Sequence, residues 1–175
     1  MGDPASPTGV DAPSGVHVVC SDEQSEVPID VDRWAHLATA VLAAEGCAGE
    51  LTLTFVDRDE MRSLNSEHMG IDSATDVLSF PLDAGTDDGV ADVPVLLGDV
   101  VVCPGVAAAN APQHAGTIDD ELALLVVHGI LHVLGHDHAE RDDASTMRAR
   151  ELDLLERLHW LGTAPADFRQ EQPDP

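Results

Sequence analysis

Histidines gather in one short stretch of the chain. Four of the nine histidines lie between His128 and His138. His128 and His132 are four residues apart, so on a helix both side chains leave the same face one turn apart and can bind one cation. Gly135 then ends the helix and lets the chain turn back, because glycine adopts a left-handed conformation at little cost. This turn allows His138 to supply a third imidazole.

The set of side chains indicates which metal would bind. Neutral imidazole suits Zn²⁺, and three histidines leave a fourth position for water or substrate. We therefore expect one zinc ion bound by His128, His132 and His138. The alternative is that these are hydrogen-bonded core histidines. It is less favoured, because each buried imidazole without a partner would cost ~1–3 kcal/mol.

The neighbours of these histidines carry weaker signals. His136 lies beside the turn and is expected to pack, or to support a ligand, rather than to bind the metal. Asp137 either orients a ligand histidine through its N–H or is an exposed turn residue. Gly129 occupies the position at which zinc peptidases with a His-Glu-X-X-His motif place their general base. Since glycine has no side chain to accept a proton, ordinary peptidase chemistry is disfavoured.

The charge of the chain is strongly negative. Thirty-three acidic residues against eight arginines and no lysine give a net charge of −25. Affinity for phosphate normally comes from Lys and Arg, so this surface repels nucleic acid at long range. It favours solubility, and a salty cytoplasm would screen the repulsion. An activity on nucleic acid therefore requires a local positive charge or a partner that brings the substrate.

The composition favours a cytoplasmic protein with no membrane segment. Hydrophobic residues make up 43% of the chain and charged residues 23%, as in ordinary globular domains. No apolar run reaches the ~18 residues of a membrane span, and the first residues lack the basic and apolar regions of a signal peptide. Cys20, Cys47 and Cys103 are an odd number at wide spacing, which argues against a disulfide scaffold and for a reducing compartment.

The elements that position the histidines can be predicted from hydrophobic periodicity and turn residues. Four strands are expected at 16–20, 51–56, 77–80 and 98–103. Helices are expected at 32–45, 57–64, 104–114, 117–134 and 141–161, and an acidic loop at 82–97 forms the tip of a hairpin. Four strands and about five helices without a repeat predict one α+β domain. We expect it to span 16–162, with a disordered lead-in at 1–15 and a loose tail at 163–175.

Three motifs together carry a family resemblance. The segment His128-Gly129-X-Leu131-His132-X-X-Gly135-X-Asp137-His138 resembles the metal signature of the YbeY family, which usually has Tyr at the position of His136. Thr75–Pro81 resembles the strand motif of that family, with Leu64-Asn65 at the right distance before it. Gly98–Pro104 resembles its next strand. The order and spacing of these motifs extend the resemblance over about residues 50–160.

The resemblance implies a function and a fold. It implies a single-strand-specific, metal-dependent endoribonuclease that acts late in 16S rRNA 3′-end maturation and in ribosome quality control. The implied fold is a mixed four-stranded sheet covered by helices, with the metal at the mouth of a cleft. Because the charge of −25 opposes binding to RNA, we expect a ribosomal protein or a ribosome-associated GTPase to deliver the enzyme to its substrate.

Substrate binding and proton transfer stay open at this point. Members of the family often carry Arg at the position of Met69, and methionine cannot bind phosphate as arginine does. Arg58 and Arg62 are nearby, but the preferred interpretation is that they are surface residues. Asp76 and Asp137 are candidate proton acceptors with equally good structural roles, so no base is assigned. The nucleophile is either water or the RNA 2′-OH.

Two other functions are compatible with the histidine cluster. One is a zinc hydrolase of another class, such as a peptidase, against which Gly129 argues. The other is a non-catalytic ribosome assembly factor with a structural metal. Three histidines with an open fourth position argue against that role, because structural zinc sites are usually closed by four ligands.

Overall fold

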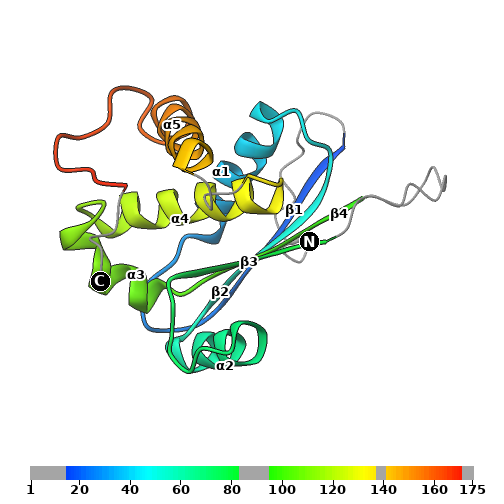
Figure 1. Ribbon diagram of the computed structural model, residues 1–175, viewed down its shortest axis with the longest axis vertical. Helices are drawn as coiled ribbons and strands as arrows, with labels where there is room; N and C mark the ends of the chain where they lie inside the picture. Colours follow the sequence, from blue (N-terminus) through cyan, green and yellow to red (C-terminus); the bar gives the residue numbers. More distant parts are fainter. Residues whose placement is uncertain (1–14, 83–94, 137–140, 171–175) are drawn as a thin grey trace, which may run out of the picture.

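Four strands form one mixed sheet at the centre of the molecule (Figure 1). This computed structural model describes residues 15–82, 95–136 and 141–170. The strand order is β1-β2-β4-β3. The first three of these are parallel and β3 runs antiparallel to β4. The strands are β1 (Val16–Glu23), β2 (Gly49–Val56), β3 (Val77–Pro81) and β4 (Leu96–Val102).

Helices lie on both faces of the sheet. They are α1 (Val31–Ala44), α2 (Arg58–Met69), α3 (Pro104–Asn110), α4 (Ile118–Val133) and α5 (Arg141–Leu158), with a short 3₁₀ turn, η1 (Ala111–Gln113). Figure 1 shows α1 and α4 on one face, α5 beyond them and α2 on the opposite face. This agrees with the predicted α+β single domain with a mixed four-stranded sheet and five α-helices.

Two helices begin at the capping residues that the sequence indicates. The side chain of Asp57 accepts a hydrogen bond from the backbone N–H of Glu60 at 2.8 Å, and Thr117 Oγ1 accepts one from the N–H of Asp120 at 3.1 Å. Each cap satisfies a donor that the first turn of a helix leaves unpaired. The Thr117 cap fixes the start of α4, the helix that carries His128 and His132.

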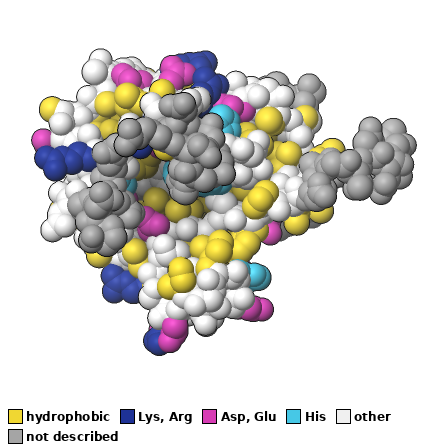
Figure 2. Space-filling model, in the orientation of Figure 1, with side chains coloured by type: hydrophobic (Ala, Val, Ile, Leu, Met, Phe, Trp, Pro, Cys, Tyr) yellow, Lys and Arg dark blue, Asp and Glu magenta, His cyan; other side chains and the backbone are white. Residues whose placement is uncertain are grey.

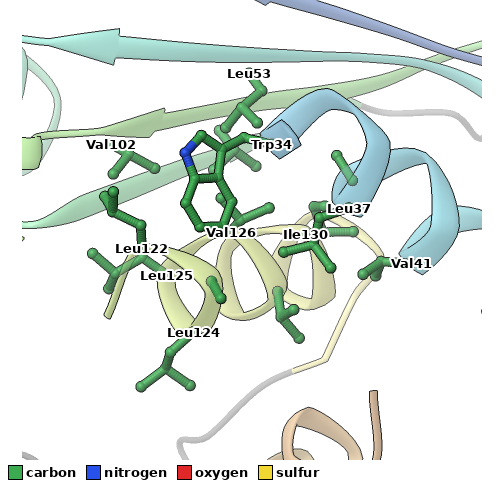
Figure 3. Close-up of a cluster of buried hydrophobic side chains, with 14 of the residues drawn as sticks. Trp34, Leu37, Val41, Leu53, Val102, Leu122, Leu124, Leu125, Val126 and Ile130 are labelled. Carbon is green, nitrogen blue, oxygen red and sulfur yellow. The ribbon is translucent and has the colours of Figure 1, made fainter. Parts of the chain in front are cut away.

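The main core lies between the sheet and α4. Helix α4 is hydrophobic almost all round because α1, α5 and the sheet all pack against it. Figure 3 shows Trp34 of α1 beside Val126 of α4, with Leu53 and Val102 of the sheet close by. A smaller cluster on the opposite face packs Met61 of α2 against the sheet. Burial on all sides holds α4 rigidly, which suits a helix that presents a reactive group.

Several predicted elements are longer in the structure, β1 and α2 most clearly. Strand β1 continues to Glu23 although the apolar pattern stops at Cys20, because the edge strand keeps its pairing with β2 while its polar side chains face solvent. Helix α2 reaches Met69 and ends at Gly70, which has a left-handed φ of 71°. Residues 83–94, which include most of the predicted acidic loop, and residues 1–14 of the expected lead-in lie outside the described residues.

The segment after α5 differs from the expected loose tail over residues 163–170. Phe168 packs edge-on against Trp160, with ring centroids 4.7 Å apart, and the N–H of Arg169 donates to the carbonyl of His114 at 3.0 Å. The ring of Phe168, the N–H of Arg169, and the carbonyl and side-chain amide of Gln170 all have partners on the domain. The Pro, Ala and Asp content of the segment did not indicate these contacts. Residues 171–175 lie outside the described residues, and the domain limits of 16 and 162 stay a prediction.

Candidate metal centre

Two of the three predicted ligands converge on one face of α4. The Nε2 atoms of His128 and His132 lie 3.0 Å apart, and their rings meet edge to face with centroids 4.5 Å apart. The i, i+4 spacing predicted this convergence. His138 and Asp137 lie outside the described residues. Within the part of the chain that the structure describes, no cluster of three His, Cys, Asp or Glu side chains could hold a metal ion.

The histidine pair lines a cavity of about 760 Å³. Its walls come from α4, the end of α2, strand β3, helix α5 and the last described residue, so segments far apart in the sequence meet here. The lining residues are Met69, Asp76, Val77, Leu78, Ser79, Pro81, His114, Leu124, Leu125, His128, His132, Glu151 and Gln170. The cavity is large enough for a nucleotide-sized ligand.

A buried carboxylate holds the ring of His128. Oε1 of Glu151, on α5, lies 2.5 Å from Nδ1 of His128. Glu151 is only 3% exposed, and a carboxylate can only accept, so Nδ1 carries the hydrogen. In that tautomer Nε2 of His128 is an acceptor, which lies 3.0 Å from Nε2 of His132 and has the lone pair that a cation would take. The imidazoles at this face of α4 therefore have the chemistry of metal ligands.

A second histidine–carboxylate pair joins the cavity wall to the core: His114 lines the cavity, and Glu121 is fully buried behind it. Nδ1 of His114 is 2.7 Å and 2.9 Å from the two carboxylate oxygens of Glu121, and its Nε2 donates to the carbonyl of Gln170 at 2.8 Å. A carbonyl can only accept, so both ring nitrogens of His114 face acceptors. The hydrogen bond to Glu121 raises the pKa of His114 above its usual value. This pair joins the loop before α4 to the helix and carries little net charge.

Asp76 faces the same cavity. Its side chain is 8% exposed, and burial raises the pKa of this carboxyl, with a further increase from the nearby charge of Glu121. A backbone hydrogen bond from the N–H of Val77 opposes the shift. Asp76 is therefore a carboxyl within the cavity wall that holds its proton more firmly than an exposed aspartate does.

Packing against the sheet leaves no room for a side chain at Gly129. A Cβ atom at this position would lie 2.6 Å from Cγ1 of Val100 and 3.3 Å from Oγ of Ser79. Ser79 Oγ also donates to the carbonyl of Gly129 at 3.0 Å. Helix α4 thus lies against the sheet where a peptidase would need a glutamate, and no side chain fits there.

The two nearby arginines have partners of their own. Arg62 makes a two-point ion pair with Asp72, with distances of 2.7 Å and 3.0 Å, and Arg58 donates to the carbonyl of Gly105 at 2.8 Å. Neither lines the cavity, which agrees with the interpretation of both as surface residues. Among the described residues, the cavity wall contains no arginine. Its rim carries Met69 instead, which is 53% exposed.

Hydrophobic side chains are exposed on this side of the molecule. In Figure 2 they form yellow areas above the region of α2, which lies at the bottom of the view. Met69 and Ile71 are among the large hydrophobic residues that are more than half exposed. The environment of the cavity is thus apolar and acidic rather than basic.

His136 and the cysteines lie elsewhere. Nε2 of His136 is 3.7 Å from Oε2 of Glu45, and His136 is not among the residues that line the cavity. All three cysteines are free, and none lines the cavity either. Burial raises the pKa of the Cys20 thiol to about 12. The cysteines therefore act as small buried or half-buried apolar residues.

The family profile of Endoribonuclease YbeY matches residues 19–159. This match covers most of β1 and all of the other three strands, and it reaches one residue past the end of α5. The chain belongs to the YbeY endoribonuclease family. The resemblance carried by the three sequence motifs is thereby confirmed, and the general activity is that of an endoribonuclease, a hydrolase of phosphodiester bonds.

Individual relatives agree with the family profile. The Endoribonuclease YbeY of Salinispora tropica is 43% identical over 150 residues, which cover 79% of this chain and 94% of the relative. That of Thermobifida fusca is 42% identical over 136 residues, covering 75% and 88%. The solution structure of a Thermotoga maritima protein matches with a TM-score of 0.56 at 25% identity, over 81% of this chain and 88% of that one.

Four polar residues of this YbeY site were missed in the sequence, namely His114, Glu121, Glu151 and Gln170. Glu121 and Glu151 fall on apolar faces of their helices, where Glu151 follows Met147 by four residues and precedes Leu155 by four. An acidic residue within an apolar stripe is a signal of a buried partner, and it could have identified both. Gln170 carried no such signal, because only the folded chain brings it to the cavity.

Proposed function

We propose that this chain is a zinc-dependent endoribonuclease specific for single-stranded RNA, with His128, His132 and His138 as the ligands of one zinc ion. The observation that carries the proposal is the approach of the His128 and His132 Nε2 atoms to 3.0 Å at a cavity of about 760 Å³. When bound, zinc supplies a Lewis acid for a phosphoryl oxygen. Gly135 has a left-handed φ of 99°, and a turn at this position supports the role of His138 as third ligand.

The residues around the histidines have separate tasks in this proposal. The cavity wall of β3 and α4 holds the RNA backbone near the ligands and excludes bulk water. Asp76 lines the same cavity and is the candidate proton acceptor that the structure describes: one of its carboxylate oxygens would take a proton from the nucleophile and return it to the leaving group. The nucleophile is either water or the 2′-OH of the RNA.

The biological substrate proposed is the 3′ end of 16S rRNA in late small-subunit maturation, together with RNA of defective ribosomes. The chain has a net charge of −25 and, among the described lining residues, no arginine in the cavity wall. We infer that a ribosomal protein or a ribosome-associated GTPase brings the enzyme to its substrate. Tight binding of the isolated protein to single-stranded RNA at physiological salt would remove the need for this partner.

The proposed location is the cytoplasm. All three cysteines are free, which fits a reducing compartment. Among the described residues, no helix is both long and apolar enough to cross a membrane.

The direct test is cleavage of a labelled single-stranded RNA that contains the 16S 3′ region. We expect cleavage by the zinc-loaded protein, weak or no cleavage of duplex RNA, and loss of activity in His128→Ala, His132→Ala and His138→Ala. The matched control is His136→Ala, which removes a histidine of the same segment outside the cavity. Equal activity in the ligand variants and the wild type would contradict the proposal.

Two further measurements separate the alternatives. Elemental analysis of protein purified without a His-tag is expected to return about one zinc per chain. If removal of zinc unfolds the protein and no RNA cleavage is ever detected, the metal is structural and the chain is an assembly factor. In vivo, depletion is expected to accumulate 16S rRNA with unprocessed 3′ ends, and only the wild-type gene and the His136→Ala gene should restore processing.

A further inference from the structure

The C-terminal segment reaches the candidate metal centre through Gln170. This residue lies beyond the stretch 19–159 that the family profile matches. His114 holds its backbone, because the carbonyl of His114 accepts from the N–H of Arg169 at 3.0 Å and Nε2 of His114 donates to the carbonyl of Gln170 at 2.8 Å. The side chain of Gln170 is thus presented to the cavity from a fixed backbone position.

The side-chain amide of Gln170 has two acceptors. Its Nε2 donates to the carbonyl of Arg148 at 2.8 Å and to Oε2 of Glu151 at 3.2 Å. An NH₂ group has two hydrogens, so both are used. The opposite orientation of the amide would place an oxygen against two acceptors. The network therefore fixes which way the amide points and which oxygen of Glu151 it contacts.

Glu151 then divides its two oxygens between two partners. Oε2 accepts from Gln170, and Oε1 accepts from Nδ1 of His128 at 2.5 Å. The side chain is only 4% exposed, so water has little access to it. With Oε2 occupied, the carboxylate plane is set and Oε1 is held toward the imidazole. The chain of contacts runs from the C-terminal segment through α5 to α4.

We propose that Glu151 and Gln170 are positioning residues for His128: Gln170 orients the carboxylate of Glu151, which keeps His128 in the Nδ1–H tautomer that leaves Nε2 available for the metal. The inference rests on the proposed metal site and deepens it. In this proposal, the segment after α5 contributes a residue to the site. A ligand histidine that must change tautomer before binding loses affinity, and outer partners of this kind typically change metal affinity 10–100-fold.

The first test measures the tautomer directly in metal-free protein. Long-range ¹H–¹⁵N spectra of histidine-labelled protein at about pH 8.5, where imidazole is neutral, identify which ring nitrogen of His128 carries the hydrogen. We expect the Nδ1–H form in the wild type and its loss as the dominant form in Glu151→Ala. Glu151→Gln keeps one acceptor oxygen for two donors, His128 Nδ1 and Gln170 Nε2, and should therefore retain only part of the Nδ1–H form. A purely structural role of Glu151 would not change this signal selectively.

The second test measures zinc affinity by competition with a chelator. We expect the dissociation constant to rise about 10–100-fold in Glu151→Ala and by a smaller, several-fold factor in Gln170→Ala. Gln113→Ala is the matched control, because it removes an exposed glutamine next to His114 and should leave the affinity unchanged. Circular dichroism at each step verifies the fold, and Gln170→Ala carries the affinity test if Glu151→Ala does not fold.

Two outcomes would overturn the proposal. One is a His128 that keeps the Nδ1–H form in folded Glu151→Ala. The other is zinc affinity within a factor of two of the wild type in both Glu151→Ala and Gln170→Ala. Failure of the zinc site itself is distinguishable, since wild-type protein would then bind no zinc while the tautomer measurement in metal-free protein would still report on Glu151.

Discussion

Gly129 of α4 lies so close to Val100 of β4 that a Cβ atom on the glycine would be 2.6 Å from Cγ1 of the valine. Two non-bonded carbon atoms do not approach this closely, so one of them would have to move. Val100 is fully buried and β-branched, so its side chain cannot rotate away freely. The separation of the helix from the sheet, and with it the position of His128 one residue earlier, is set by this contact.

Substitution Gly129→Ala is therefore expected to destabilise the protein. Overpacking of a core typically costs about 1–3 kcal/mol, and the better helix propensity of alanine offsets about 0.8–1 kcal/mol of it. Urea unfolding should show a net loss of up to about 2 kcal/mol. Gly162→Ala is the control, because no atom lies within 4 Å of a Cβ there. A Gly129→Ala variant as stable as wild type would show that the helix can shift.

Zinc is expected to stabilise the folded protein through the histidines. A ligand that binds only the native state at 100 times its Kd adds about 2.7 kcal/mol, so the melting temperature should rise on addition of zinc to EDTA-treated protein. The rise should be absent or much smaller in His128→Ala and His132→Ala. The rise should be retained in His136→Ala, because the side chain of His136 faces Glu45 in the wild type. Equal zinc stabilisation of all four proteins would place the binding site elsewhere.

The buried pair of His114 and Glu121 predicts a dependence of stability on pH. The pKa of His114 is raised in the folded state by its hydrogen bond to Glu121. A raised pKa gives stabilisation that is fully present below the unfolded-state pKa of ~6.5 and is lost as the pH rises through the folded-state pKa. The difference in stability between wild type and His114→Asn should thus be largest near pH 5.5–6.5 and shrink toward pH 9.

That difference is expected to be about 3 kcal/mol at the acidic end, because removal of one partner leaves Glu121 fully buried without its cation. Thermal melts in the presence of EDTA separate this effect from metal binding. The exposed His17→Asn provides the control for loss of a histidine from the surface. A constant difference across the pH range would mean that folding does not change the pKa of His114.

An arginine at position 69 is expected to strengthen binding of RNA. Met69 lines the cavity and is 53% exposed, and no arginine is present among the described residues of the cavity wall. Met69→Arg adds one positive charge that can contact a phosphate in two places. We expect KM for a single-stranded RNA to fall several-fold at low salt, and the gain to diminish as salt rises.

Ile71→Arg is the matched control for this gain. Ile71 is 54% exposed, two residues along the chain, and is not among the residues that line the cavity. If both variants improve KM equally, the effect is one of net charge alone. If neither does, RNA does not pass the rim formed by Met69.

The sequence by itself determined the strands, the helices and the spacing of the histidines. Hydrophobic periodicity and capping residues are local signals, and α4 with its His128–His132 pair follows from a 3.6-residue repeat between Thr117 and Gly135. The family also followed from residues at fixed spacing along the chain. Edge pairing of β1 beyond Cys20 did not, since that depends on a neighbouring strand.

Only the tertiary structure decided which side chains surround the histidines. Glu151 reaches His128 from 23 residues further along the chain, and Gln170 reaches Glu151 from another 19. Such contacts depend on how α5 and the last residues pack on α4, and no periodic pattern specifies them. The tight contact at Gly129 likewise depends on the distance between a helix and a sheet. Long-range packing, rather than local propensity, therefore built the environment in which the predicted histidines lie.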